Sequence, residues 1–117
     1  MLKIYVYSGC DTCRKALKFL AARKTAHTAV PIRETPPSVA ELQEMLKAQG
    51  GDLRKLFNTS GRDYKELGMA GKLPALAEGD ALALLARNGN LVKRPFLIGP
   101  GVRLVGFKEE AWRAALG

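Results

Sequence analysis

Two cysteines, three positions apart and directly after the first expected strand, limit most strongly which folds are open to this chain. Residues 2–7 alternate in character and are rich in β-branched and aromatic types, which predicts a strand that residues 8–9 end. Residues 11–23 place their apolar side chains on one face of a helix. We therefore expect Cys10 and Cys13 at a turn between a strand and a helix.

The composition narrows what these cysteines do. The chain has 117 residues, 47% of them hydrophobic, so we expect a single domain with a substantial core. Two cysteines and the single histidine, His27, are too few for a disulfide-stapled scaffold or a four-ligand zinc site. We therefore expect no metal and no bound cofactor, and we expect His27, at the start of a strand, to be structural.

Hydropathy bears on the compartment. The sequence has no run of about 20 apolar residues, and its first seven residues are too polar for a secretory leader. We therefore expect a cytoplasmic protein that does not contact the membrane. In that compartment, closely spaced thiols are more often catalytic or redox-sensing than structural.

The chain is basic, with 19 Lys and Arg against 11 Asp and Glu and a net charge of +8. Such an excess favours anionic partners in general. The basic residues are scattered, however, and aromatic residues do not interleave with them as in single-strand-binding proteins, so we expect no direct DNA binding. A solvated helix face is the expected role of the densest group, Arg14, Lys15, Lys18, Arg23 and Lys24.

Beyond the first helix the pattern becomes extended and then wholly helical. Residues 27–33 predict a strand at the sheet edge, because Pro31 cannot donate a hydrogen bond. Strand, helix and strand make a βαβ unit. Ser38 and Glu41 form a capping box at the start of the next helix. The further helical segments are expected at residues 53–57, 62–67 and 76–87.

The sheet is expected to resume after this helical block. Residues 91–98 read as extended, and a turn at residues 99–101 leads to a hairpin partner at residues 102–105. A final helix over residues 107–116 would turn Trp112 and Leu116 inward. The order βαβ, helical block, ββα predicts one α/β domain over residues 1–117 with a thioredoxin-like fold and an all-helical insertion at about residues 36–89.

The chemistry is expected at the first turn. A helix N-terminus favours thiolate over thiol, so the pKa of Cys10 should fall below the free value of about 8.5. Cys13, one turn further on, is placed to attack a mixed disulfide on Cys10. The negative charge of Asp11 is expected to raise the pKa of Cys10. The positive charges of Arg14 and Lys15 partly offset that effect. Two buried, inert thiols are the alternative, above all for Cys13, which could simply pack in the helix face.

A second feature is the sequence Lys93-Arg94-Pro95. By analogy with thioredoxin-like proteins, Pro95 is expected to be a cis-proline facing the cysteines, with Arg94 projecting toward Cys10. A guanidinium there could bind a thiolate, a sulfinate or an oxyanion such as arsenate. A solvent-exposed strand arginine is the alternative. We expect a helix to be capped by the polar residues Asn58, Thr59 and Ser60. The alternative is that these residues lie close to the site.

Several stretches in the right order make the chain resemble the arsenate reductase-like (ArsC/Spx) family, nearest to its Spx/MgsR/YffB-type members. These stretches are residues 8–16 (SGCDTCRKA), 57–61 (FNTSG), 93–97 (KRPFL) and 105–110 (VGFKEE). The resemblance covers nearly the whole chain. It implies a thioredoxin-like fold with a helical insertion, in agreement with the pattern above.

The family's arsenate reductases imply one set of roles. Their single cysteine, matching Cys10, attacks arsenate, arginines bind the oxyanion, and glutathione with glutaredoxin completes the reduction. Arg94 matches one of those arginines. Asn58 stands about where the reductases have a second, and Phe107 or Lys108 stands where they have a third. The candidate substrate-binding residues are Pro95, Asn58 and Arg14.

The family's other branches imply two further readings. Spx proteins are redox-sensing transcription factors that use a cysteine pair and bind the RNA polymerase α subunit, while Spx-like thiol reductases are thought to act with glutathione. We expect a thiol–disulfide oxidoreductase with Cys10 as nucleophile, Cys13 as resolving thiol and Arg94 as anion-stabilising residue, acting on a thiol, disulfide or oxyanion substrate. Glutathione or glutaredoxin would be the co-reductant. A regulator switched by a Cys10–Cys13 disulfide is the alternative.

Overall fold

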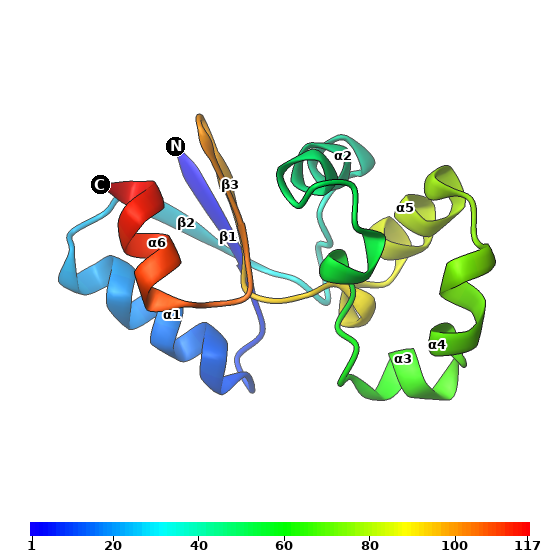
Figure 1. Ribbon diagram of the computed structural model, residues 1–117. Coiled ribbons are helices and arrows are strands. Elements are labelled where there is room, and N and C mark those ends of the chain that lie inside the picture. Colours follow the sequence, from blue (N-terminus) through cyan, green and yellow to red (C-terminus); the bar gives the residue numbers. More distant parts are fainter.

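The computed structural model describes residues 1–117 and has a four-stranded sheet with helices on both faces (Figure 1). The α/β architecture predicted from the sequence is confirmed. Its strands and α-helices are β1 (Leu2–Val6), α1 (Asp11–Ala22), β2 (His27–Pro31), α2 (Val39–Ala48), α3 (Arg62–Glu66), α4 (Met69–Lys72), α5 (Glu78–Arg87), β3 (Phe96–Gly99), β4 (Val102–Val105) and α6 (Glu109–Leu116). Short 3-10 helices are η1 (Leu53–Leu56), η2 (Leu73–Ala75) and η3 (Gly89–Leu91).

The sheet has the strand order β2-β1-β3-β4. β1 pairs in parallel with β2, as a βαβ unit requires, and antiparallel with β3, which forms a hairpin with β4. The edge position predicted for the second strand from Pro31 is confirmed, because β2 has only β1 as a neighbour.

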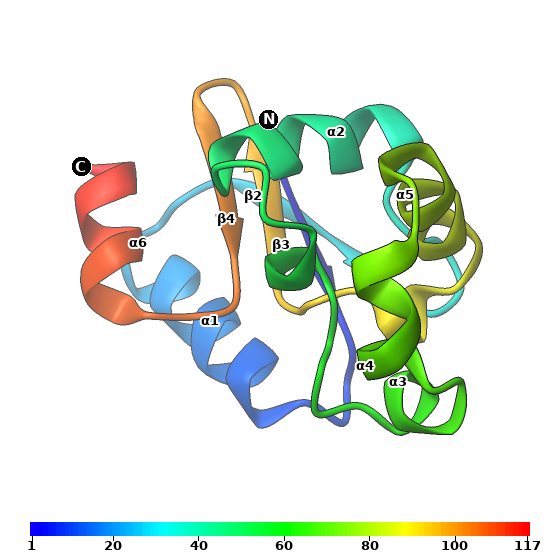
Figure 2. The ribbon, with the colours of Figure 1, turned by 45° about the vertical axis from the view of Figure 1, so that its right-hand side comes forward.

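Alternation along the central strands divides the interior into two cores. Ile4 of β1 and Leu97 of β3 face α1 and α6, where Leu20 and Trp112 are also fully buried. Tyr5 and its neighbours on β3 face the helical insertion instead, in a much larger core. Figures 1 and 2 show the two sides, with α1 and α6 on one face of the sheet and the helices from α2 to α5 on the other.

The insertion begins where the capping box was predicted. The Ser38 hydroxyl accepts from the Glu41 backbone N–H at 3.1 Å, and the Glu41 carboxylate accepts from the Ser38 N–H at 3.0 Å. The same carboxylate accepts from the Tyr5 hydroxyl at 2.6 Å and pairs with Lys3 at 2.5 Å. One side chain therefore starts α2 and also fastens it to β1.

Several predicted boundaries are wrong, among them the start of α6, which begins at Glu109 rather than residue 107. The second strand ends at Pro31, where a turn begins, rather than at residue 33. Gly68, with a positive φ of 64°, follows the C-cap of α3 as predicted but also starts α4, which was not predicted. α5 begins at Glu78, not residue 76, and residues 89–91 form η3 ahead of β3.

No helix has the length and apolar character needed to cross a membrane.

Candidate functional site

Cys10 is the residue at the N-terminal cap of α1. Its backbone is extended, with φ −104° and ψ 114°, and its sulfur accepts a hydrogen bond from the Cys13 N–H at 3.3 Å. The Cys10 N–H donates to the Tyr7 carbonyl at 3.1 Å, which closes the turn after β1. The half-buried sulfur thus faces the positive end of a twelve-residue helix, as the sequence predicted.

Cys13 lies one turn further along α1 and is 1% exposed. It packs on the inward face of the helix with Ala16 and Leu20. Both cysteines are free thiols. Only Cys10 is open to a substrate approaching from solvent, so the two cysteines are unequal in access.

Their electrostatics are also unequal. Burial by itself would raise the pKa of Cys10, but hydrogen bonds from Cys13 and the nearby Arg94 guanidinium outweigh it and hold that pKa below its ordinary value. Burial, followed by the hydrogen bond to Cys10, raises the pKa of Cys13 to about 12. The arrangement therefore favours a thiolate on Cys10 and a protonated Cys13.

Arg94 and Pro95 lie beside the cysteines, where β3 begins. The peptide bond between them is cis, as predicted, and Pro95 is buried. The Pro95 carbonyl accepts from the Gly106 N–H at 2.9 Å, which ties this segment to the turn after β4. Arg94 is half-buried, its charge acts on Cys10, and its guanidinium lies 4.9 Å from the centre of the Tyr7 ring.

A second arginine, Arg33, which was not predicted to belong to the site, also contacts the Tyr7 ring. The Arg33 guanidinium lies 4.5 Å from the centre of the Tyr7 ring, and its Nε donates to Asn90 at 2.5 Å. The close approach depends on Gly89, because a Cβ there would lie 1.8 Å from the Ile32 carbonyl oxygen. Arg33 and Asn90 are 57 residues apart, so no local pattern could have paired them.

Asn58 joins Arg33 and Arg94 along the wall of a cavity of about 260 Å³ that no hydrophobic residue lines. The predicted capping role of Asn58, Thr59 and Ser60 is wrong, because Gly61 is the N-cap of α3 and no side chain caps that helix. The structure instead gives Asn58 the alternative position, in the same cavity as Arg94.

Charges elsewhere in this polar cavity already have partners. Arg62 pairs with Glu66 at 3.2 Å, and the Asp63 carboxylate accepts from Asn88 at 3.1 Å and from Asn90 at 3.4 Å. The guanidinium groups of Arg33 and Arg94 have no carboxylate partner. These two arginines are therefore the cations in this cavity that are free to bind an anion.

Arg14 lies on the other side of the cysteine turn. It donates to the Ser8 carbonyl at 2.7 Å and pairs with Asp11. Together with Cys13 it lines a separate cavity of about 610 Å³ beside β2. The structure thus places Arg14 near the cysteines but not in the polar cavity that holds Arg94 and Asn58.

His27 and the acidic residues do not assemble a metal site. One ring nitrogen of His27 lies 2.8 Å from the Thr25 carbonyl oxygen, a structural contact. No three side chains of the His, Cys, Asp or Glu types come together as ligands.

Fold and site together define a thioredoxin-like domain with a cysteine pair at the start of its first helix. The model of the ArsC family matches residues 5–115, and the chain belongs to that family. A solved structure of an ArsC family related protein from Bacteroides fragilis is 41% identical, covers 97% of this chain and 96% of that chain, and superimposes with a TM-score of 0.90.

Curated relatives fall on both sides of the family's functional division. YusI, an uncharacterized protein of Bacillus subtilis, is 43% identical over 93% of this chain and 92% of its own length. An arsenate reductase of Rhizobium meliloti is 31% identical over 86% of this chain and 71% of its own length. The global transcriptional regulator Spx of Enterococcus faecalis is 28% identical, covering 99% of this chain and 86% of its own length.

Proposed function

We propose that the protein is a thiol–disulfide oxidoreductase in which Cys10 is the nucleophile, Cys13 the resolving thiol and glutathione the reductant. One observation carries the proposal: the half-buried Cys10 sulfur lies at the N-terminus of α1 with a lowered pKa, while Cys13 is buried one turn behind it with a raised pKa. In such a pair one thiol attacks the substrate and the other resolves the adduct, because only Cys10 is both accessible and shifted toward the thiolate.

The first half of the reaction is an attack on a substrate disulfide. The Cys10 thiolate forms a bond to one substrate sulfur, and the bond between the two substrate sulfurs breaks, so that one substrate half leaves as a thiolate. The mixed disulfide removes the negative charge from Cys10. Since hydrogen bonding and charge at Cys10 help to raise the pKa of Cys13, that pKa then falls toward a value at which Cys13 can react.

The second half closes and then reopens the protein disulfide. Cys13 attacks the Cys10 sulfur, its proton passes to the departing substrate thiolate, and a Cys10–Cys13 disulfide remains. Two glutathione molecules restore both thiols, the first by forming a mixed disulfide with Cys10 and the second by releasing it as glutathione disulfide. The two electrons given to the substrate therefore come from glutathione.

The residues around the sulfur have supporting roles in this proposal. Arg94 stabilises the thiolate by charge and by hydrogen bonding, and Pro95 shapes the surface that a substrate backbone meets. Asn58 lines the same polar cavity as Arg94 and contacts the polar part of the substrate. Arg14 binds the Ser8 carbonyl and so holds the turn that carries Cys10.

An oxyanion such as arsenate is a second substrate class for the same sulfur. Arg33 and Arg94 supply two guanidinium groups without carboxylate partners, and the named arsenate reductase among the relatives supports this reading. Asn58 stands where the resemblance implies a further arginine. We therefore expect arsenate to be reduced more slowly than a disulfide.

Trapping the mixed disulfide tests the proposal. With a glutathionylated peptide as substrate, Cys13→Ser should accumulate a one-to-one adduct on Cys10, visible by intact mass, while the wild-type protein should proceed to the internal disulfide. Cys10→Ser should form no adduct. An adduct on Cys13 in the Cys10→Ser variant at the wild-type rate would contradict the assigned roles.

A redox-switched regulator is the second candidate, favoured by the Spx relative whose match covers 99% of this chain. In that case the Cys10–Cys13 disulfide would change binding to the RNA polymerase α subunit rather than turn over. Co-purification with the α subunit that depends on oxidation, together with no reduction of disulfide or arsenate by glutathione, would favour the regulator.

A further inference from the structure

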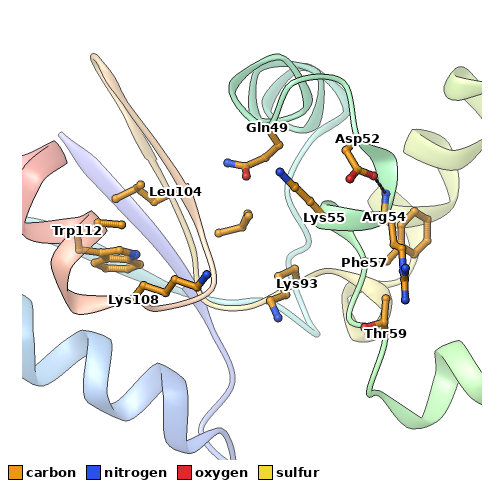
Figure 3. A pocket seen from close by; sticks show the side chains of 12 residues that line it. Gln49, Asp52, Arg54, Lys55, Phe57, Thr59, Lys93, Leu104, Lys108 and Trp112 are labelled. Carbon is orange, nitrogen blue, oxygen red and sulfur yellow. Dashed lines mark hydrogen bonds between the residues drawn. The ribbon is translucent and has the colours of Figure 1, made fainter.

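A second cavity, of about 580 Å³, lies between the helical insertion and the end of the hairpin that leads into α6 (Figure 3). Three lysines from separate segments border it: Lys55 from η1, Lys93 just before Arg94, and Lys108 at the start of α6. Figure 3 shows Lys55 and Lys108 reaching into the space from opposite sides, with Lys93 at its edge. We name Lys55, Lys93 and Lys108 the lysine groove.

The lysine groove carries charge that the protein does not neutralise. None of its three ammonium groups takes part in a salt bridge. Asp52 is the one carboxylate on the cavity wall, and it accepts a hydrogen bond from the Arg54 backbone N–H at 3.1 Å. Arg54 adds a further positive charge to the same wall. The cavity therefore has a surplus of cations and favours an anionic ligand.

The floor of the cavity is firmly built and partly apolar. Trp112 is 1% exposed, and its indole N–H donates to the Gly106 carbonyl at 2.9 Å. Gly106 has a φ of 68°, and a Cβ there would lie 3.1 Å from the Lys93 side chain, so the residue leaves room for that lysine. Leu104 and Phe57 also line the cavity. Such a surface suits an organic anion better than a bare inorganic one.

The lysine groove also adjoins the residues around Cys10. Lys93 immediately precedes Arg94, and the Pro95 carbonyl accepts from the N–H of Gly106, whose own carbonyl accepts from the indole of Trp112 on the cavity floor. Asn58 of the polar cavity lies between Phe57 and Thr59, both of which line this one. A ligand held by the lysines would therefore lie beside the segment that faces the reactive sulfur.

We infer that the lysine groove binds the carboxylates of the peptide thiol that reduces Cys10, a ligand of the glutathione class. The inference rests on the proposed function, since it names where the reductant is held. Glutathione combines two carboxylates with a central thiol on a small, partly apolar peptide, and the cavity offers separated cations, an apolar floor and a volume within the usual range for small ligands. The bound thiol would attack Cys10 as described above.

An assay without catalysis tests the inference. S-methylglutathione cannot react, and Cys10→Ser removes the nucleophile, so titration of this variant at low ionic strength reports binding alone. Adding K55Q/K93Q/K108Q should weaken binding roughly fivefold to tenfold. A control set, K47Q/K65Q/K72Q, removes the same charge from exposed lysines outside the groove and should leave the affinity unchanged. Circular dichroism confirms that each variant is folded.

Competition separates the carboxylates from other anions. The diethyl ester of S-methylglutathione should bind weakly to every variant, and inorganic phosphate should not displace S-methylglutathione at equal concentration. Equal losses in the groove and control sets, displacement by phosphate, or no binding to the variant with intact lysines would each overturn the inference. Because Cys10 is absent, these outcomes are independent of the trapping experiment, which tests the proposed function.

Discussion

The two sides of the sheet divide the work of the molecule unequally. The side under α1 and α6 has a core of only five buried residues, yet its helix holds both cysteines. The insertion side buries 17 residues and holds neither. The insertion contributes side chains to the cavities beside the site, because Asn58 lines the polar cavity and Lys55 lines the lysine groove. The side with the smaller core thus holds both cysteines, and the side with the larger core lines the cavities through which a ligand would approach them.

The largest expected effect comes from removing the nucleophile on the α1 side. Cys10→Ser should lower disulfide turnover by roughly a thousandfold or more, because the covalent step has no replacement. Coupled oxidation of glutathione measures the rate. Asn58→Ala, on the insertion side, is the contrasting variant and should retain most of the activity. If Asn58→Ala were as damaging as Cys10→Ser, the division between the two sides would fail.

The next effect compares the two cores directly. Leu20→Ala and Leu85→Ala each remove a fully buried leucine, and each should cost about 2–5 kcal/mol in urea unfolding. Only Leu20→Ala should also slow alkylation of Cys10, because Leu20 packs the helix whose N-terminus holds the sulfur. Equal slowing in both variants would show that the cysteine turn depends on the insertion core as well.

A smaller effect is expected where the two sides are joined. Burial would raise the pKa of Glu41, but hydrogen bonds from Lys3, Tyr5 and the Ser38 N–H hold it below its ordinary value. Glu41→Gln should therefore cost about 1–2 kcal/mol at pH 7. A lowered carboxyl pKa stabilises the fold above pH 4.5, and that contribution disappears as the pH falls through the folded-state pKa. The difference from wild type should accordingly shrink in acid.

Glu44 supplies the control for that variant. It lies on the same helix and pairs with Arg103 of β4 at 3.5 Å, but both side chains are largely exposed. Glu44→Gln should change the free energy of unfolding by less than about 0.5 kcal/mol. A cost equal to that of Glu41→Gln would mean that overall charge, rather than the bonds of Glu41, explains the loss.

The smallest expected effect is a change in the pKa of Cys10, and it distinguishes Arg94 from Arg33, which both contact the Tyr7 ring. Arg94→Gln should raise the pKa of Cys10, since the Arg94 charge and hydrogen bond are among the causes that lower it. Arg33→Gln removes an equivalent contact with Tyr7 but no contribution to the Cys10 pKa, so it should leave that pKa nearly unchanged. The pH dependence of alkylation measures both. A larger shift for Arg33→Gln would reverse the assignment.

How far the sequence predicted the structure differs between the two sides. On the α1 side the strand, the turn and the helix, with Cys10 at its start and Cys13 on its apolar face, depend on residues close in the chain. Local patterns could therefore indicate them. The capping box of Ser38 and Glu41 was predictable for the same reason. Pro95 was predicted to be cis only by analogy with thioredoxin-like proteins.

Contacts between distant residues were not predictable from local patterns. Arg33 reaches Tyr7 and Asn90 only because Gly89 packs against the backbone at Ile32. The lysine groove likewise gathers residues from three separate segments. α4 was missed because a glycine with positive φ usually ends a helix, whereas Gly68 also starts the next one.

The central claim is that Cys10 and Cys13 are unequal thiols, and the most direct measurement is their alkylation rate against pH, one cysteine at a time. In Cys13→Ser, which keeps a hydrogen-bond donor beside the sulfur, Cys10 should react rapidly with a midpoint below that of an ordinary free thiol. In Cys10→Ala, Cys13 should remain protected at neutral pH by burial, the first cause of its raised pKa. A Cys10 midpoint at or above that of an ordinary free thiol, or equal reactivity of the two cysteines at pH 7, would contradict the account.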